Sequence, residues 1–259
     1  MMQLTNKVIV LTGANGLLGK TFIQSLLAEG ASLALIDLSF DEEIMKKFSG
    51  DNRVQIFNID ITNEYELEKC FQVIFEHFSR IDGLVNNAAI NPKVEDTLSN
   101  MTGLDSLNYS NWKKELDVGL YGAVLCSKFA FKYIAQNSDG GSIVNIGSDY
   151  GHLAPKQSLY KENSKKPITY SVVKFGLIGA TKYLATYFAY KKVRVNALSP
   201  GGIFNGQDID FVEKISREIP LSRMAQSDEI CGALVFLLSD KSTYVTGLDL
   251  IIDGGRSAW

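Results

Sequence analysis

The stretch KVIVLTGANGLLG (residues 7–19) joins an apolar run to a turn that holds three glycines. The run before the turn has the aliphatic, β-branched composition of a buried strand. Gly13, Gly16 and Gly19 keep side chains out of the turn, and the helix that follows offers free N–H groups and its positive dipole end to a phosphate. The stretch therefore predicts a strand–turn–helix unit that binds a dinucleotide pyrophosphate; tight helix packing is the alternative explanation for the glycines.

Apolar runs and amphipathic stretches alternate along the rest of the chain. Strands are predicted at residues 7–12, 32–37, 54–60, 82–88, 141–148, 193–199 and 248–253, and helices near 17–29, 63–79, 110–136, 169–190 and 227–239. The nearly continuous Val, Ile and Leu of the strands indicates a sheet covered on both faces. We predict an α/β fold, a Rossmann-like doubly wound parallel sheet of about seven strands with helices on both faces, built as a single domain over residues 1–259.

Two long irregular connections, residues 91–110 and 152–168, follow predicted strands. The carboxyl ends of parallel strands meet at one edge of the sheet, where open α/β sheets bind their ligands. Both connections are therefore predicted to lie on the substrate side.

Composition and charge exclude several classes of protein. A formal net charge of −3 over 259 residues gives no electrostatic argument for binding nucleic acid or a membrane surface. No apolar run reaches the roughly 18 residues of a spanning helix, and the N-terminus lacks a signal-peptide pattern. Cys70, Cys126 and Cys231 form no C-x-x-C motif, so we predict small buried side chains in a reducing cytoplasm. The only histidines are His77 and His152, and no metal site is predicted.

An acidic residue, Asp37, ends the second predicted strand, 18 residues beyond Gly19. A carboxylate there can accept hydrogen bonds from the adenosine ribose hydroxyls and repels a 2′-phosphate. Its expected neighbours, Asn15 and Leu38, supply no compensating cation. The position favours NAD(H) over NADP(H); a strand-end or helix-capping aspartate is the alternative.

A Tyr and a Lys four residues apart share one face of a helix, and the ammonium can make the phenol an acid or base near neutral pH. The chain has four such pairs, Tyr65/Lys69, Tyr109/Lys113, Tyr170/Lys174 and Tyr187/Lys191. The spacing alone does not choose between them.

Several motifs together resemble the short-chain dehydrogenase/reductase family, in its shorter single-domain branch. They are TGANGLLG (residues 12–19), Asp60-Ile61, NNAA (residues 86–89), GSIVNIGS (residues 141–148), YSVVK (residues 170–174), NALSPG (residues 196–201) and IDGG (residues 252–255). They cover nearly the whole chain in the family's order. That order selects Tyr170/Lys174, because only this pair follows an apolar strand ending in Ser and opens a long helix.

The resemblance implies that Ser148, Tyr170 and Lys174 are catalytic. It also implies cofactor contacts from the glycine turn, the ends of the strands and the catalytic helix. These are Gly13, Asn15, Gly16, Leu17, Leu18, Gly19, Asp37, Leu38, Asp60, Ile61, Asn87, Ala88, Ala89, Val118, Ile146, Tyr170, Lys174, Pro200, Gly201 and Ile203.

The chain departs from the family pattern at two places. The branch usually has glycine where Leu17 stands, and this chain has Gly16 instead. The family also has a catalytic Asn where Gly119 stands, and that Asn helps to hold a relay water near the lysine, largely through its main-chain carbonyl. Gly119 keeps the carbonyl and loses the side chain, so an intact relay and a slow or silent protein both stay open.

The chemistry implied by the resemblance is hydride transfer between NAD(H) and a secondary alcohol or ketone (EC 1.1.1.-). Tyr170 is the general base for oxidation and the general acid for reduction. Bringing its pKa from about 10 to 7 needs roughly 4 kcal/mol, and an ammonium 4–5 Å away supplies about 3–4 kcal/mol at an effective dielectric of ~20. Lys174 and the cofactor's positive charge are together about sufficient, and Ser148 stabilises charge on the substrate oxygen.

The connection HLAPKQSLYKENSKKPI (residues 152–168) carries four lysines against one glutamate. This charge beside the predicted cleft favours an anionic small-molecule substrate such as a phosphorylated or carboxylated sugar; a solvated loop is the alternative. The predicted substrate contacts are Tyr150, His152, Lys156 and Tyr160.

Three loop segments, SDYG…LYKEN, LDVG and SPGGIFNGQD, resemble a bacterial subgroup associated with flagellin and surface-glycan sugar modification. An amino sugar or a nonulosonic-acid precursor is therefore the predicted substrate. The alternatives are a 3-oxoacyl-thioester reductase, a polyol dehydrogenase, and a catalytically silent NAD(H)-binding scaffold or sensor. The family usually pairs its two long helices between subunits, which predicts a homodimer or homotetramer in the cytoplasm.

Overall fold

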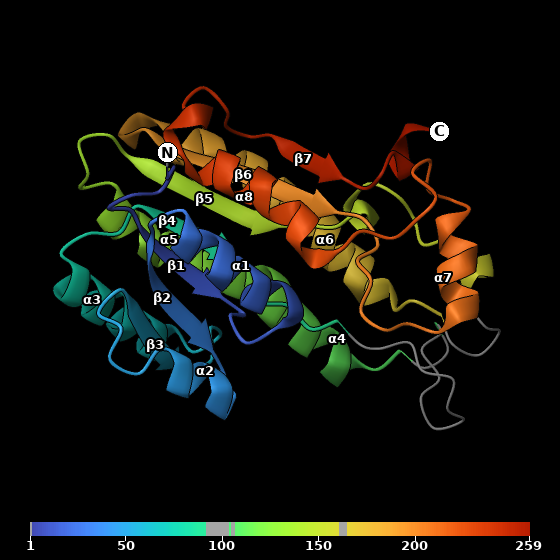
Figure 1. The fold of residues 1–259 in the computed structure, drawn as a ribbon, viewed down its shortest axis with the longest axis horizontal. Coiled ribbons are helices and arrows are strands. Elements are labelled where there is room, and N and C mark those ends of the chain that lie inside the picture. The colour runs from blue at the N-terminus through green and yellow to red at the C-terminus, as the bar shows by residue number, and fades with distance from the viewer. Residues whose placement is uncertain (1, 92–103, 105–106, 161–164) are drawn as a thin grey trace.

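The computed structural model describes residues 2–91, 104, 107–160 and 165–259. Seven parallel strands form one sheet in the order β3-β2-β1-β4-β5-β6-β7 (Figure 1). They are β1 (Val8–Thr12), β2 (Ser32–Asp37), β3 (Val54–Asn58), β4 (Gly83–Asn86), β5 (Gly141–Ile146), β6 (Val193–Pro200) and β7 (Asp249–Ile252). This order reverses direction between β1 and β4, as in a doubly wound sheet. The predicted fold class is confirmed.

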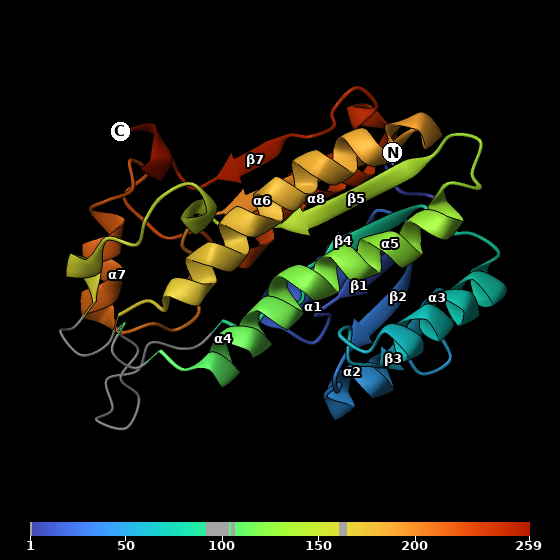
Figure 2. The ribbon, with the colours of Figure 1, turned by 180° about the vertical axis from the view of Figure 1, so that it is seen from behind.

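Helices cover both faces of the sheet. In Figure 1, α1 and α8 cross the near face, and Figure 2 shows α3, α5 and α6 across the opposite face. The helices are α1 (Leu17–Ala28), α2 (Glu42–Lys47), α3 (Glu64–Phe78), α4 (Tyr109–Leu116), α5 (Ala123–Ile134), α6 (Ile168–Phe188), α7 (Ile209–Ser216) and α8 (Cys231–Leu238). Among the described residues, no helix is both long and apolar enough to cross a membrane.

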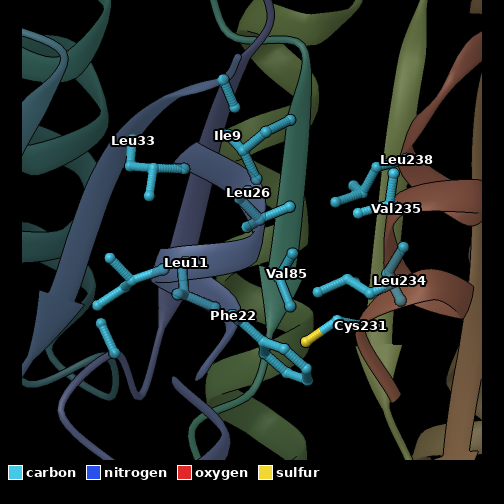
Figure 3. Close-up of a cluster of buried hydrophobic side chains, with 14 of the residues drawn as sticks. Ile9, Leu11, Phe22, Leu26, Leu33, Val85, Cys231, Leu234, Val235 and Leu238 are labelled. Carbon is cyan, nitrogen blue, oxygen red and sulfur yellow. The ribbon is translucent and has the colours of Figure 1, made fainter. Parts of the chain in front are cut away.

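The apolar strands are buried because each face of the sheet meets a helical layer. On one face, Phe22 and Leu26 of α1 and Leu234 of α8 lie against the sheet residues Ile9 and Val85 (Figure 3). Burying one such side chain stabilises the fold by roughly 1.5–3 kcal/mol. A second cluster fills the space between the sheet and the helices α3, α5 and α6.

The structure contains helical elements that the apolar periodicity of the sequence did not predict. The predicted helix near 110–136 is divided into α4 and α5 by a π-helical turn over Asp117–Gly122. Two short helices, α2 and α7, were not predicted. In α2 only Ile44 is buried, and in α7 only Ile215, so neither has a long apolar stripe that would have marked it.

Ligand-side connections gather at the carboxyl ends of the strands. The segment after β5 forms two single turns, Asp149–Gly151 and Gln157–Leu159, before α6 begins. Most of the predicted 91–110 connection, and Lys161 to Ser164 of the 152–168 connection, lie outside the described residues.

Candidate active site

A cavity of about 1100 Å³ opens along the carboxyl ends of β1, β2, β4, β5 and β6. Ligand pockets usually have volumes of about 300–1,000 Å³, so this one has room for a large ligand or for two adjacent ones. Tyr170 and Lys174 of α6 line one part, and Asp37 of β2 lines another. The sheet therefore joins the predicted catalytic pair and the predicted nucleotide residues in one space.

The glycine turn between β1 and α1 has close backbone contacts. Gly13 has φ +63°, and a Cβ on it would lie 2.7 Å from the Cα of Ala88. A Cβ on Gly19 would lie 2.3 Å from the Gly13 carbonyl oxygen. Asn87 donates a side-chain hydrogen bond to that oxygen at 2.8 Å. Gly13 lines the cavity, whereas Gly19 only lets α1 approach the turn.

Asp37 lies beside this turn at the end of β2. Its carboxylate accepts backbone hydrogen bonds from Asn15 at 2.9 Å and from Leu38 at 2.8 Å. Lys20, a cation of α1, is held by Asp41 with an N–O distance of 2.5 Å. Asp37 therefore faces the cavity with its carboxylate held by backbone donors.

Every other predicted cofactor contact except Gly19 lines the same cavity. Beyond the residues already described, these are Gly16, Leu17, Leu18, Asp60, Ile61, Ala89, Val118, Ile146, Pro200, Gly201 and Ile203. Leu17, which stands where the family branch usually has glycine, therefore places an apolar side chain on the wall of the cavity. The glycine turn, the free N–H groups at the start of α1 and the size of the cavity fit a dinucleotide.

A buried polar network fixes α6 against the sheet. The Asn145 side chain of β5 donates to the Thr181 hydroxyl of α6 at 2.8 Å, and its oxygen accepts from Asn86 of β4 at 2.8 Å. Thr181 also donates to the Leu177 carbonyl at 2.8 Å. Because the Asn145 amide and the Thr181 hydroxyl are buried and paired, they define the position of the helix that carries Tyr170 and Lys174.

Lys174 is 5% exposed, and its ammonium donates to the Ile146 carbonyl oxygen at 2.8 Å. Burial lowers the pKa of Lys174 to about 8, and the neighbouring Lys166 acts in the same direction. The bond fixes the ammonium at the end of β5, next to the Tyr170 ring, whose centroid is 5.6 Å away.

Burial raises the pKa of Tyr170 to about 12, and the Ser148 hydroxyl opposes this by hydrogen bonding. We expected the Lys174 charge to have the largest effect on the pKa of Tyr170, but in the structure burial is the largest cause of the shift and the Lys174 charge is not among the causes. Tyr170 is therefore largely protonated near neutral pH in the cofactor-free protein.

Ser148 is 6% exposed and follows β5. Its hydroxyl donates to the Asp149 carboxylate at 3.0 Å and accepts from the Tyr150 backbone N–H at 3.2 Å. Asp149 in turn forms a buried ion pair with Arg256, with an N–O distance of 2.5 Å. The Ser148 hydroxyl is therefore oriented by a chain of partners that reaches the C-terminal segment.

The four predicted substrate contacts separate into two groups. The Tyr150 and Tyr160 hydroxyls lie 2.9 Å apart, and both residues line the cavity. His152 instead pairs with Asp249 at 2.5 Å, and Lys156 pairs with Glu218 at 2.7 Å. Neither of the latter two lines the cavity, so we do not propose them as substrate residues.

Six charged residues that line the cavity were not predicted as site residues: Lys113, Lys114, Asp117, Asp149, Lys166 and Arg256. Asp149 directly follows Ser148, and Lys166 belongs to the lysine-rich connection, so both were close to recognised signals. Arg256 follows the IDGG motif by one residue, and nothing in the sequence linked it to residues more than 100 positions earlier.

Another residue occupies the space that the side chain of the family's Asn would need at position 119. Gly119 is buried in the π-helical turn and does not line the cavity. A Cβ at this position would lie 2.6 Å from Cγ1 of Val173, the residue before Lys174. Val173 thus fills the space beside Gly119.

The chain is similar to known proteins over almost its full length. A family profile described as enoyl-(acyl carrier protein) reductase matches residues 13–257. Post-translational flagellin modification protein A of Campylobacter coli is 32% identical, with 98% of this chain and 99% of that protein covered. Human 3-oxoacyl-[acyl-carrier-protein] reductase is also 32% identical, with 96% and 98% covered. A crystal structure of a short-chain dehydrogenase from Leptospira borgpetersenii with bound NAD⁺ has a TM-score of 0.86 and 31% identity, and covers 98% of this chain and 94% of that one.

Proposed function

The chain belongs to the short-chain dehydrogenase/reductase family, and from this premise we propose that it transfers hydride between NAD(H) and a secondary alcohol or ketone of a sugar derivative. Family membership makes it a nicotinamide-dependent oxidoreductase acting on CH–OH groups. The observation that carries the proposed mechanism is the convergence of Ser148, Tyr170 and Lys174 on one cavity whose far part is lined by the glycine turn and Asp37.

The preference for NAD(H) rests on Asp37. Its carboxylate is held at the cavity wall by two backbone donors, where it can accept the ribose hydroxyls and repel a 2′-phosphate. Lys20, a cation that could compensate, is already paired with Asp41. The related Leptospira enzyme was solved with NAD⁺, which supports the same choice.

The bound cofactor supplies or accepts a hydride at nicotinamide C4, and the protein moves the proton. Tyr170 takes the proton from the substrate hydroxyl during oxidation and returns it during reduction. Ser148 turns its single O–H from Asp149 to the substrate oxygen, where negative charge develops. Lys174, held by the Ile146 carbonyl, favours the ionised form of Tyr170 through its charge.

For the substrate we propose an amino sugar or related sugar carrying a negative charge, used in surface-glycan biosynthesis. The relative named for flagellin modification supports this assignment. So does Lys166, which lines the cavity beside Tyr170. The lysine-rich connection contributes less than its composition suggested, because Lys156 is paired with Glu218 and points elsewhere.

A 3-oxoacyl-thioester reductase is the second candidate. The matching family profile and the human relative are both named for acyl-carrier-protein reductases. Such an enzyme with NADPH as its reductant would need the Asp37 end of the cavity to accept a 2′-phosphate. A comparison of NADH and NADPH with an acetoacetyl thioester therefore separates this function from the sugar dehydrogenase.

We propose that the functional form is a homodimer or homotetramer. Large apolar side chains remain exposed along α6 and at the start of α4, and they include Phe175, Tyr183 and Tyr187 of α6 and Tyr109 of α4. Exposed apolar side chains grouped on adjacent helices favour an interface. Light scattering of the purified chain tests this proposal, and a monomeric mass at micromolar concentration would contradict it.

The experiment that tests the function follows NADH absorbance with NAD⁺ and a panel of free, phosphorylated and nucleotide-linked amino sugars. The panel includes polyols and an acetoacetyl thioester, and the reverse reactions use the matching keto compounds. Tyr170→Phe is assayed beside the wild type. We expect turnover on a sugar derivative that falls by at least 100-fold in the variant. Turnover that survives the substitution would refute Tyr170 as the acid–base group, and tight NADH binding without any turnover would favour a silent scaffold.

A further inference from the structure

A second lysine lies against the Tyr170 ring. The Lys166 Nζ is 3.9 Å from the ring centroid, closer than the 5.6 Å of Lys174. Lys166 precedes α6, four residues before Tyr170, and Lys174 is one turn after Tyr170. Both lysines line the cavity. Tyr170, the proposed proton carrier, therefore has one ammonium group from the segment before α6 and a second from the next turn of α6 near its ring.

The surroundings of Lys166 hold its ammonium in place without neutralising it. The ammonium donates to the Asn91 side-chain oxygen at 2.5 Å, which is a neutral partner. Within the part of the chain that the structure describes, no carboxylate oxygen lies within 4.0 Å of it. Burial lowers the pKa of Lys166 to about 8, and the more distant carboxylates of Glu115 and Asp149 oppose this.

The other charged groups around Tyr170 are few. Asp149 and Tyr150 raise the pKa of Tyr170, in addition to the larger effect of burial, and Ser148 lowers it. The Asp149 charge is largely compensated by its ion pair with Arg256. Among the described residues, Lys166 and Lys174 are thus the two cations over the ring, with Nζ 3.9 and 5.6 Å from its centroid, that no partner carboxylate cancels.

We propose that Lys166 is a second positioning cation, which stabilises the Tyr170 phenolate together with Lys174. This inference rests on the proposed function, in which Tyr170 is the general base. An ammonium over an aromatic face is attracted by the ring electrons, and the attraction grows when ionisation spreads negative charge into the ring. With Nζ above the ring centre, the phenolic oxygen is only about 5 Å away, a range at which an opposite charge shifts a pKa by about 1–3 units.

A second cation also helps to offset the unfavourable effect of burial on the Tyr170 phenolate. Burial raises the pKa of Tyr170 to about 12 and lowers that of Lys174 to about 8. A single desolvated lysine must therefore offset a large unfavourable effect before Tyr170 can act near neutral pH. A second ammonium supplies part of this stabilisation, and by linkage an ionised Tyr170 keeps both lysines protonated.

The decisive measurement is the titration of Tyr170 itself. Tyrosinate ultraviolet absorbance is followed against pH for the full-length protein, with and without saturating NAD⁺. The curve of Tyr170→Phe is subtracted from that of the wild type, which leaves the titration of one tyrosine. The same subtraction is made in a Lys166→Met background. In the NAD⁺-saturated protein we expect the Tyr170 pKa to rise by about one to two units when Lys166 is replaced. Without cofactor the change should be small, because Lys166, with a pKa of about 8, is already neutral when Tyr170 ionises near pH 12.

Matched variants separate charge from structure. Lys182 lies on the exposed side of the same helix, about 18 Å along it from Tyr170, so Lys182→Met should leave the Tyr170 titration unchanged. Lys166→Arg keeps the charge and should stay close to the wild type. If Lys166→Met does not fold, Lys166→Gln removes the same charge and keeps an amide that can bond to Asn91.

The proposal is overturned if, with NAD⁺ bound, a folded Lys166→Met protein titrates Tyr170 within a few tenths of a unit of the wild type. It is also overturned if only the KM for substrate rises while the titration is unchanged, because Lys166 would then act on the substrate. A failure of the proposed function is seen elsewhere, as turnover that survives Tyr170→Phe. In the pH profile of kcat/KM for oxidation, the pKa of the acidic limb should rise by the same amount as the Tyr170 pKa in the titration.

Discussion

Cγ1 of Val173 lies 2.6 Å from the position that a Cβ on Gly119 would take. The two residues are therefore a matched pair: a glycine in the π-helical turn and a branched side chain on α6 share one space. The family's asparagine could not stand at residue 119 with valine at residue 173, because a valine is restricted at χ1 and cannot easily turn away.

The pair predicts non-additive mutant stabilities. Gly119→Asn should lower the free energy of unfolding by about 1–3 kcal/mol, because the added side chain overfills the site. Val173→Ala relieves the contact, so Gly119→Asn combined with Val173→Ala should be more stable than the Gly119→Asn single variant by at least about 1 kcal/mol. Urea unfolding of the wild type and the three variants gives the coupling. Strictly additive effects would contradict the steric explanation.

Asp37 predicts the cofactor preference. Asp37→Ser should reduce the discrimination against the phosphorylated cofactor by at least 10-fold, because it removes the negative charge that repels the 2′-phosphate. The ratio of dissociation constants for NADH and NADPH, measured by quenching of protein fluorescence, reports this without a known substrate. Glu43→Gln, an exposed change of the same charge on the next helix, serves as the control. An unchanged ratio in Asp37→Ser would remove the basis for assigning NAD(H).

The seven strands could be predicted from the sequence because a parallel sheet buried on both faces leaves continuous apolar runs. The two short helices could not, since each buries a single side chain. Within the site, the glycine turn, Asp37 and the Ser148, Tyr170 and Lys174 set could be placed because local motifs carry them.

Partnerships between distant segments had no such signal. Arg256 meets Asp149 only after β5 and β7 take their places in the sheet. The summed charge of the lysine-rich connection, likewise, did not indicate which of its lysines face the cavity. One of its lysines, Lys156, is neutralised by Glu218, while Lys166 lies inside the cavity. Side-chain direction, which composition does not encode, decides which charges a ligand meets.

The Asp149–Arg256 ion pair predicts a large loss of stability when one partner is removed. Both side chains are buried, at 4% and 6% exposure, so Arg256→Met leaves an unpaired buried carboxylate. The expected loss is about 3–5 kcal/mol. Adding Asp149→Asn should restore part of this loss, because the remaining group is neutral. Urea unfolding measures both variants, and equal stabilities would show that packing rather than charge is responsible.

The same pair predicts an effect on catalysis through Ser148. The Ser148 hydroxyl donates to Asp149, so a displaced Asp149 misdirects the group that would meet the substrate oxygen. In the Asp149→Asn, Arg256→Met double variant, kcat should fall by at least 10-fold while NADH binding stays near that of the wild type. If kcat is retained in a folded double variant, the orientation of Ser148 does not depend on this chain of partners.

Lys174 predicts an unusual dependence of stability on pH. Burial lowers its pKa to about 8 in the folded protein, whereas an unfolded lysine titrates near 10.4. Between these values the unfolded state binds more protons, so the free energy of unfolding should rise as pH increases from about 8 to 10. Below pH 8 the full cost of the buried charge is present. Lys166 acts in the same direction, because its pKa is also lowered to about 8.

Replacing this lysine should therefore stabilise the cofactor-free protein at pH 7 while abolishing turnover. Lys174→Met should gain about 2–3 kcal/mol at pH 7, corresponding to a shift of roughly two pKa units, and should lose much of the rise above pH 8. Urea unfolding at pH 7, 8 and 9 measures both effects, with the exposed Lys182→Met as the control. A Lys174→Met protein less stable than the wild type at pH 7 would mean that the hydrogen bond to the Ile146 carbonyl outweighs the cost of burying the charge.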